Sequence, residues 1–187
     1  MPKEKDDINF NWLSMMQHYG APSRMLDFSF SPYVALFFAI SGIDTEAVVF
    51  CVKYSELQEI DNKFYPDIDD IKTNVMKQNT DINRAILIPY EPQFTNNRIM
   101  AQQGAFLIPN TINYSHDDIL NKYDNDNFVY KIIIHEEIAY QLIEKLAQMN
   151  ISSINIYPGL EGFCKSFENI GIIPINRLRP INTELNA

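Results

Sequence analysis

The sequence of 187 residues contains only two cysteines, Cys51 and Cys164. They lie far apart in the sequence and form no Cys-x-x-Cys pair, which argues against both a cysteine-based zinc site and a disulfide framework. No secretory leader is recognisable either. We therefore expect reduced thiols in a cytoplasmic protein, with Cys164 buried in a helix as a small apolar side chain.

Long apolar runs and an excess of basic residues are also missing. No apolar run reaches the roughly 18 residues that cross a bilayer, so no transmembrane segment is predicted. The chain carries 15 Lys and Arg against 24 Asp and Glu, a net charge of −9. Because an acidic surface repels phosphate backbones, general nucleic-acid binding is disfavoured.

Familiar catalytic and metal-binding motifs are lacking as well. The three histidines, His18, His116 and His135, are dispersed, and no His-x-His or His-Glu-x-x-His pair occurs, so no metal site is expected. Neither a Gly-x-Ser-x-Gly elbow nor a phosphate-binding P-loop is present. The motifs therefore imply no firm cofactor.

What the sequence does contain is the composition of an ordinary globular chain, with 46% hydrophobic residues. We expect a single domain over residues 1–187 with its core at about 8–172. Helices are predicted at 8–20, 33–42, 115–123 and 136–150, strands at 46–54, 84–90, 105–109 and 127–135, and a strand or loop at 151–157. The 33–42 helix is apolar all round and should be buried, and 46–54 should be a central strand. Short strands without a regular alternation predict an α+β fold, in which helices flank a mixed or antiparallel sheet of short strands.

The stretch QHYGAPSRMLDFSFSPYVALFFAI, residues 17–40, concentrates polar chemistry just before an apolar helix. Arg24 and Asp27 could form an ion pair across a turn, or Arg24 could face an anion, since a guanidinium forks onto phosphate or carboxylate. Ser29 and Ser31 alternate on an extended segment and project the same way. Ser31 also fits the N-cap of a helix that starts at Pro32, which leaves Ser29 as the freer hydroxyl beside an anion-favouring helix start.

This stretch resembles the central signature of the FRG domain, a family of bacterial and phage-borne proteins. The matching positions are Gln17, His18, Tyr19, Gly20, Pro22, Arg24, Leu26, Asp27, Pro32, Ala35, Leu36, Phe38 and Ala39. The segment NRIMAQQGAFLIP is similar to the family's Arg-x-x-x-Gln-x-Gly-x-Phe stretch, with Arg98 in the leading position. INIYPGLEG is similar to a late family motif, with Gly159 where an acidic residue is usual. The Phe-Arg-Gly motif expected upstream of Gln17 is absent, so we expect an N-terminally truncated FRG domain.

The order of these motifs also resembles ADP-ribosyltransferases of the arginine–serine–glutamate class. In that resemblance Ser29 and Ser31 brace the nicotinamide-ribose strand, and Gln102 or Gln103 stands in the catalytic position where a glutamate is expected. Loss of the glutamate removes a group that stabilises an oxocarbenium-like transition state. The resemblance therefore implies NAD binding with or without transfer, and leaves it open whether the chain is an enzyme.

Three functions follow as alternatives. The first is an NAD- or nucleotide-binding, ADP-ribosyltransferase-like domain, in phage defence or a toxin system. The second is a non-catalytic protein-recognition module, and the third is a nuclease-like effector, which the acidic balance disfavours. The expected ligand-binding residues are Gln17, His18, Tyr19, Arg24, Asp27, Ser29, Ser31 and Arg98, with Gln102 and Gln103 as catalytic positions. Convergence of Arg24, Ser29, Arg98 and Gln103 on one pocket would favour the first reading.

Overall fold

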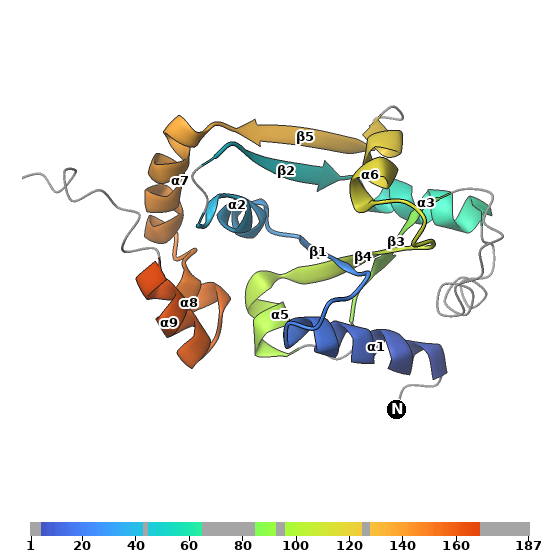
Figure 1. The fold of residues 1–187 in the computed structure, drawn as a ribbon, viewed down its shortest axis with the longest axis horizontal. Helices are drawn as coiled ribbons and strands as arrows, with labels where there is room; N and C mark the ends of the chain where they lie inside the picture. Colours follow the sequence, from blue (N-terminus) through green and yellow to red (C-terminus); the bar gives the residue numbers. More distant parts are fainter. Residues whose placement is uncertain (1–4, 43–44, 65–84, 93–95, 125–127, 169–187) are drawn as a thin grey trace, which may run out of the picture.

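The computed structural model describes residues 5–42, 45–64, 85–92, 96–124 and 128–168 (Figure 1). Its helices are α1 (Lys5–His18), α2 (Pro32–Ile40), α3 (Tyr54–Phe64), α5 (Asn97–Gln102), α6 (His116–Asp124), α7 (Glu136–Gln148), α8 (Ser153–Ile156) and α9 (Leu160–Glu168). Its strands are β1 (Leu26–Ser29), β2 (Ala47–Val52), β3 (Leu87–Tyr90), β4 (Gly104–Pro109) and β5 (Val129–Ile134). The predicted α+β class with short strands is confirmed.

The strands form two antiparallel sheets rather than one. The first has the order β1-β4-β3, and the second pairs β2 with β5. The prediction of a central strand at 46–54 is therefore wrong, since β2 pairs with β5 alone among the described strands. β2 is rich in valine because it packs apolar side chains on both of its faces. A strand that is apolar on both faces has the same sequence pattern as a strand in the centre of a sheet.

Local signals fix the ends of the first two helices. Gly20 follows α1 with a φ of +84°, the left-handed backbone that glycine adopts at a helix end. Ser31 caps α2, and its hydroxyl accepts the N–H of Val34 at 3.4 Å. The segment at 151–157 does not form the expected strand or loop, because its middle turns into the short helix α8.

Two apolar cores hold the fold together. The first lies where the three-stranded sheet meets α1, α3 and α6, and includes the fully buried Leu57, Ile86 and Leu120. The second lies among α2, β2, α7 and α8, with Val34 and Leu146 at its centre. The β2–β5 pair connects them, since Phe50, Val52 and Val129 contact the first core, while Ala47, Val49 and Ile134 belong to the second.

Two expectations of burial are wrong. The helix α2 is not enclosed on all sides, because Tyr33 is 51% exposed and Phe38 is 41% exposed. Cys164 is exposed on α9 instead of buried. Within the described residues, no helix has the length and apolar character that crossing a membrane requires.

Candidate functional site

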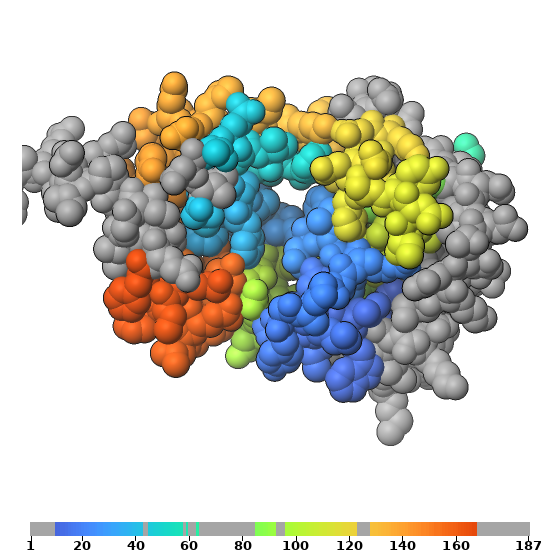
Figure 2. Space-filling view, viewed as in Figure 1, coloured from blue at the N-terminus to red at the C-terminus, as the bar shows by residue number. Residues whose placement is uncertain are grey.

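A cavity of about 480 Å³ lies between the two sheets, bounded by β1 and β4, by β2, and by the helices α1, α2, α5 and α6. Figure 2 shows the molecule hollowed between α6 and the segment that holds α2 and β2. Six of the predicted site residues line it: Gln17, His18, Asp27, Ser29, Arg98 and Gln102.

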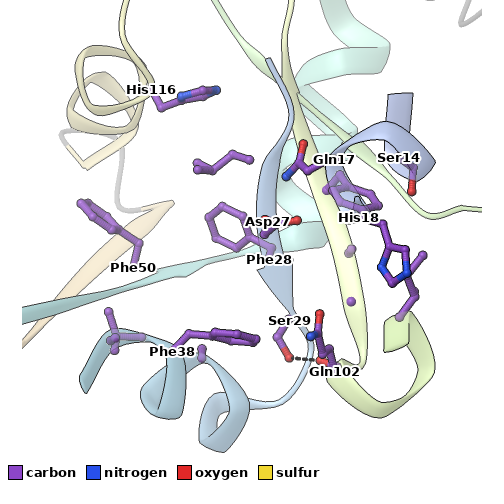
Figure 3. A pocket seen from close by; sticks show the side chains of 18 of the residues that line it. Ser14, Gln17, His18, Asp27, Phe28, Ser29, Phe38, Phe50, Gln102 and His116 are labelled. Atoms are coloured by element: carbon purple, nitrogen blue, oxygen red, sulfur yellow. Dashed lines mark hydrogen bonds between the residues drawn. The ribbon is translucent and has the colours of Figure 1, made fainter. Parts of the chain in front are cut away.

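The cavity wraps around β1 and differs in chemistry on its two sides. In Figure 3, Phe28, Phe38 and Phe50 lie on one side of β1, and Ser14, Gln17 and His18 lie on the other. The three phenylalanines come from β1, α2 and β2, three elements far apart in the sequence. An apolar wall opposite convergent polar groups is typical of small-molecule sites.

The strand β1, which contributes residues to the cavity lining, is an edge strand of its sheet. Phe30 donates its N–H to the carbonyl of Gln103 at 2.9 Å, in the register that pairs β1 with β4. Alternate residues of an antiparallel strand turn their backbone N–H and C=O groups to opposite sides. The backbone groups of Phe28 therefore point toward β4, whereas those of Asp27 and Ser29 point away from it. Among the described strands, none pairs with that outer side of β1.

The hydroxyl of Ser29 is occupied by the protein itself, contrary to the expectation that it is the freer one. It donates to the carbonyl of Gln102 at 2.7 Å and accepts the N–H of Ser31 at 3.0 Å. These bonds tie the end of α5 to the loop before α2. Ser29 thus lines the cavity while it also fixes the cavity's shape.

The adjacent amides Gln102 and Gln103 have separate environments. Gln102 lines the cavity, and its Nε2 donates to the carbonyl of Ile156 at 3.4 Å. Gln103 ends α5 in the left-handed conformation, with φ 47° and ψ 46°, and its side chain is exposed away from the cavity lining. Of the two predicted catalytic positions, only Gln102 is therefore placed to contact a ligand in the cavity.

Three other predicted site residues lie outside the cavity lining. Tyr19 is 81% exposed and meets the ring of His18 edge-on. Ser31 is used as the helix cap. Arg24 is partly buried, which lowers the pKa of its guanidinium, and its carbonyl lies 2.9 Å from Nε2 of His116. The proposed convergence is thus partial, since Ser29 and Arg98 line the cavity, but Arg24 and Gln103 do not.

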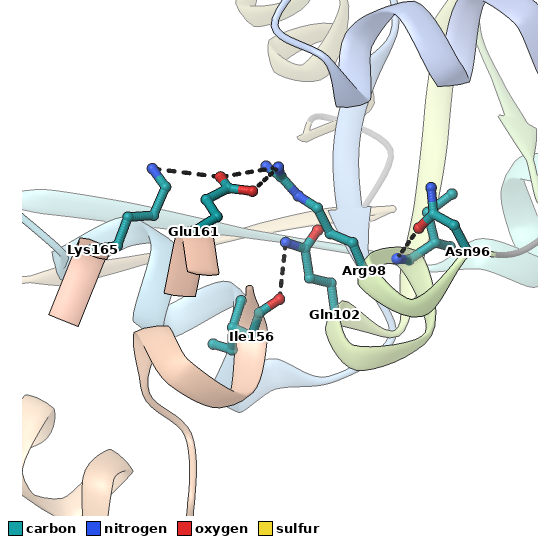
Figure 4. Close-up of polar contacts among 7 residues, drawn as sticks. Asn96, Arg98, Gln102, Ile156, Glu161 and Lys165 are labelled. Atoms are coloured by element: carbon teal, nitrogen blue, oxygen red, sulfur yellow. Dashed lines mark hydrogen bonds and ion pairs between the residues drawn. The ribbon is translucent and has the colours of Figure 1, made fainter. Parts of the chain in front are cut away.

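Among the described residues that line the cavity, Arg98 is the one arginine or lysine. Its Nη1 lies 3.2 Å and 3.1 Å from the two carboxylate oxygens of Glu161 on α9 (Figure 4). Its guanidinium also lies over the ring of Tyr157, 4.8 Å from the centroid. Lys165 lies over the same ring at 4.6 Å and is 3.9 Å from Glu161.

His18 lies close enough to this group to feel its charges. Burial lowers the pKa of His18 below 6.5, and the positive charge of Arg98 lowers the pKa further, while Glu161 opposes the shift. The imidazole is therefore neutral at pH 7 and can donate one hydrogen bond and accept another.

The aromatic wall and the α6 side of the cavity were missed from the sequence. Phe38 and Phe50 were expected in a buried helix and a central strand, Phe28 was not singled out, and His116 and Asp117 looked like the start of a helix. A signal for Phe38 existed, since α2 has too many apolar positions for one buried face. No group of three His, Cys, Asp or Glu suited to a metal ion occurs among the described residues.

The comparisons with known proteins support the family inferred from the motifs. The family model of the FRG domain matches residues 1–47, which supports the resemblance to the FRG family over that part of the chain. The matched part contains α1, β1 and α2, and thus Gln17, His18, Asp27 and Ser29 of the cavity. The resemblance of the later segments, with Arg98 and Gln102, lies outside it. No curated protein and no solved structure matches the chain.

Proposed function

We propose that the cavity binds NAD or a related nucleotide, with the flat base or nicotinamide ring placed among Phe28, Phe38 and Phe50. The observation that carries this proposal is the meeting of the FRG-signature residues with an aromatic wall in one cavity. Its volume of about 480 Å³ lies within the range of roughly 300 to 1,000 Å³ typical of small-molecule sites. Aromatic side chains bind flat heterocycles by stacking.

The polar side of the cavity suits the sugar of such a ligand. Gln17 and Gln102 supply amides, His18 supplies a neutral imidazole, and Asp27 supplies an acceptor for hydroxyl groups. An amide at Gln102 cannot provide the negative charge that the ADP-ribosyltransferase resemblance expects there. We therefore propose binding as the function and treat group transfer as a further step that the same assay can reveal through release of nicotinamide.

Isothermal titration with NAD tests this proposal through a matched pair of variants on α2. Phe38→Ala removes a ring that lines the cavity, and Tyr33→Ala removes a similarly exposed ring of the same helix outside the lining. Loss of one stacked ring costs roughly 1 to 3 kcal/mol, so Phe38→Ala should weaken NAD binding about fivefold or more. Tyr33→Ala should bind as the unaltered chain does.

Equal affinities in Phe38→Ala and the unaltered chain would reject the aromatic wall as the binding surface. Absence of saturable heat in the unaltered chain would reject nucleotide binding by this chain. Thermal unfolding of both variants, measured alongside, separates lost binding from lost fold.

The open edge of β1 favours a second candidate function, recognition of an extended peptide that adds a strand beside β1. Asp27→Pro tests it, because proline removes the outward N–H of Asp27 and keeps the bonds of β1 to β4. Peptides selected from a displayed random library on the unaltered chain should lose binding to Asp27→Pro. Selected peptides that bind both proteins equally would exclude strand addition at this edge.

A further inference from the structure

We infer that Arg98 and Lys165 form a phosphate-binding site at the rim of the cavity, which would hold the phosphate of a nucleotide whose ring lies against Phe38. This inference rests on the proposed function and specifies which part of the ligand lies where.

The guanidinium of Arg98 has unused hydrogen-bonding capacity at the cavity wall. Both contacts with Glu161 use the same nitrogen, Nη1. The Nη2 and Nε groups have no hydrogen-bond partner among the described residues, although the side chain is only 25% exposed. A guanidinium binds an anion most strongly when two of its nitrogens donate to two oxygens of that anion. In Arg98, Nη2 and Nε can make this pair of hydrogen bonds.

Tyr157 places the two cations next to the aromatic wall. Its ring meets Phe38 edge-on, with 5.9 Å between the centroids. Arg98 and Lys165 each lie over that same tyrosine ring, at 4.8 Å and 4.6 Å. A ring bound against Phe38 would thus be separated from both positive charges by one side chain, that of Tyr157.

The local charges favour an anion at this rim and disfavour it elsewhere in the cavity. Arg98 and Lys165 share the single carboxylate of Glu161, which leaves one positive charge in excess. The other carboxylates that line the cavity, Asp27 and Asp117, come from β1 and α6. Because they repel phosphate, the ligand should lie with its charged end toward α5 and α9.

Glu161 plays two opposing parts in this arrangement. Its carboxylate holds Arg98 in place, and it also weakens the attraction of the same guanidinium for an anion. Glutamine at this position keeps an oxygen for Nη1 and removes the negative charge. Glu161→Gln should therefore raise the affinity for a phosphate-bearing ligand and leave the affinity for its phosphate-free counterpart unchanged.

Titrations with the two halves of NAD test the inference. AMP is compared with adenosine, and nicotinamide mononucleotide with nicotinamide riboside, on the unaltered chain, Arg98→Gln, Lys165→Gln and Glu161→Gln. Hydrogen bonds to a charged group are each worth about 1.5 to 3 kcal/mol, so at least one mononucleotide should bind roughly tenfold or more tightly than its nucleoside. Arg98→Gln should abolish that preference, Lys165→Gln should reduce it, and nucleoside affinity should stay constant in both.

The control is Lys122→Gln, which removes a cation that lies 4.1 Å from the ring centroid of Tyr114 and outside the cavity lining. An equal loss of the phosphate preference in Lys122→Gln would show that the preference depends on the overall charge of the protein, and would overturn the inference. A preference that survives in Arg98→Gln would overturn it too, while NAD binding that persists would leave the proposed function standing. Absence of heat with NAD and all four smaller ligands would overturn both.

Discussion

Gln102 and Gln103 are neighbours in sequence with opposite surroundings. Gln102 faces the cavity and bonds to the carbonyl of Ile156, while Gln103 carries the left-handed turn that ends α5. We predict that Gln102→Ala weakens NAD binding about fivefold to tenfold, the cost of one neutral hydrogen bond. Gln103→Ala should leave the affinity unchanged, and isothermal titration of the two variants decides. A larger loss in Gln103→Ala would show that the other amide contacts the ligand.

The lowered pKa of His18 predicts a pH dependence of stability. Burial and the charge of Arg98 lower the pKa of the folded imidazole below 6.5, so the unfolded chain takes up this proton at a higher pH than the folded chain does. Because the unfolded state then binds more protons, the free energy of unfolding should fall as the pH drops below 6.5. Urea unfolding on either side of that pH should show a shallower fall for His18→Gln. Identical pH slopes in both proteins would contradict this reading.

At single positions, the sequence singled out polar residues of the cavity lining more readily than apolar ones. Gln17, His18 and Asp27 stood out because they are polar residues just before an apolar helix, and Arg98 stood out through its place in a family motif. Phe50 gave no such signal, and the excess of apolar positions in α2 did not single out Phe38, because a buried aromatic and a cavity-lining aromatic have the same sequence pattern. Which of them faces a cavity depends on the packing of elements distant in the chain.

The stability of the helix α2 depends on its N-cap, Ser31. Ser31 is buried and its hydroxyl accepts the N–H of Val34. Ser31→Ala should lower the free energy of unfolding by about 1 kcal/mol, because that N–H loses its partner. Ser31→Asp, which keeps an accepting oxygen, should recover most of the loss in urea unfolding. NAD affinity should be unchanged in both variants, and a loss of affinity without a loss of stability would assign Ser31 to ligand binding instead.

Elements with strong local signals were predictable, and their partners were not. The glycine after α1 and the Ser-Pro start of α2 act within a few residues, so these ends could be read from the sequence. The pairing of β2 with β5 joins residues about eighty positions apart, as in Val49 opposite Ile132. Nothing local in β2 distinguishes such a pair from a central position in one larger sheet.

At the scale of the whole molecule, the β2–β5 pair should make the two cores unfold together. Leu57 belongs to the first core and Leu146 to the second, and both are fully buried. Leu57→Ala and Leu146→Ala should each lower the free energy of unfolding by about 2 to 5 kcal/mol. Each variant should keep one transition, with the same midpoint by far-ultraviolet and near-ultraviolet circular dichroism. Two separate transitions in either variant would show that the cores are independent.

The cavity is lined by strands of both sheets. Its lining combines Phe28 of β1, from the three-stranded sheet, with Phe50 of β2, from the two-stranded sheet. The FRG match covers β1 and α2, while β2, α5 and α9 complete the surroundings from later parts of the chain. A ligand in this cavity would therefore contact both sheets at once.

The central claim is that this cavity is where a nucleotide binds, and amide chemical-shift mapping tests it most directly. A 15N-labelled chain is titrated with NAD, and the residues whose amide signals move are identified. We predict shifts at Asp27 to Ser29, around Phe38 and Phe50, and at Gln102 to Gly104, with the exposed face of α7 unaffected. An unchanged spectrum, or shifts confined to α7, would contradict the account.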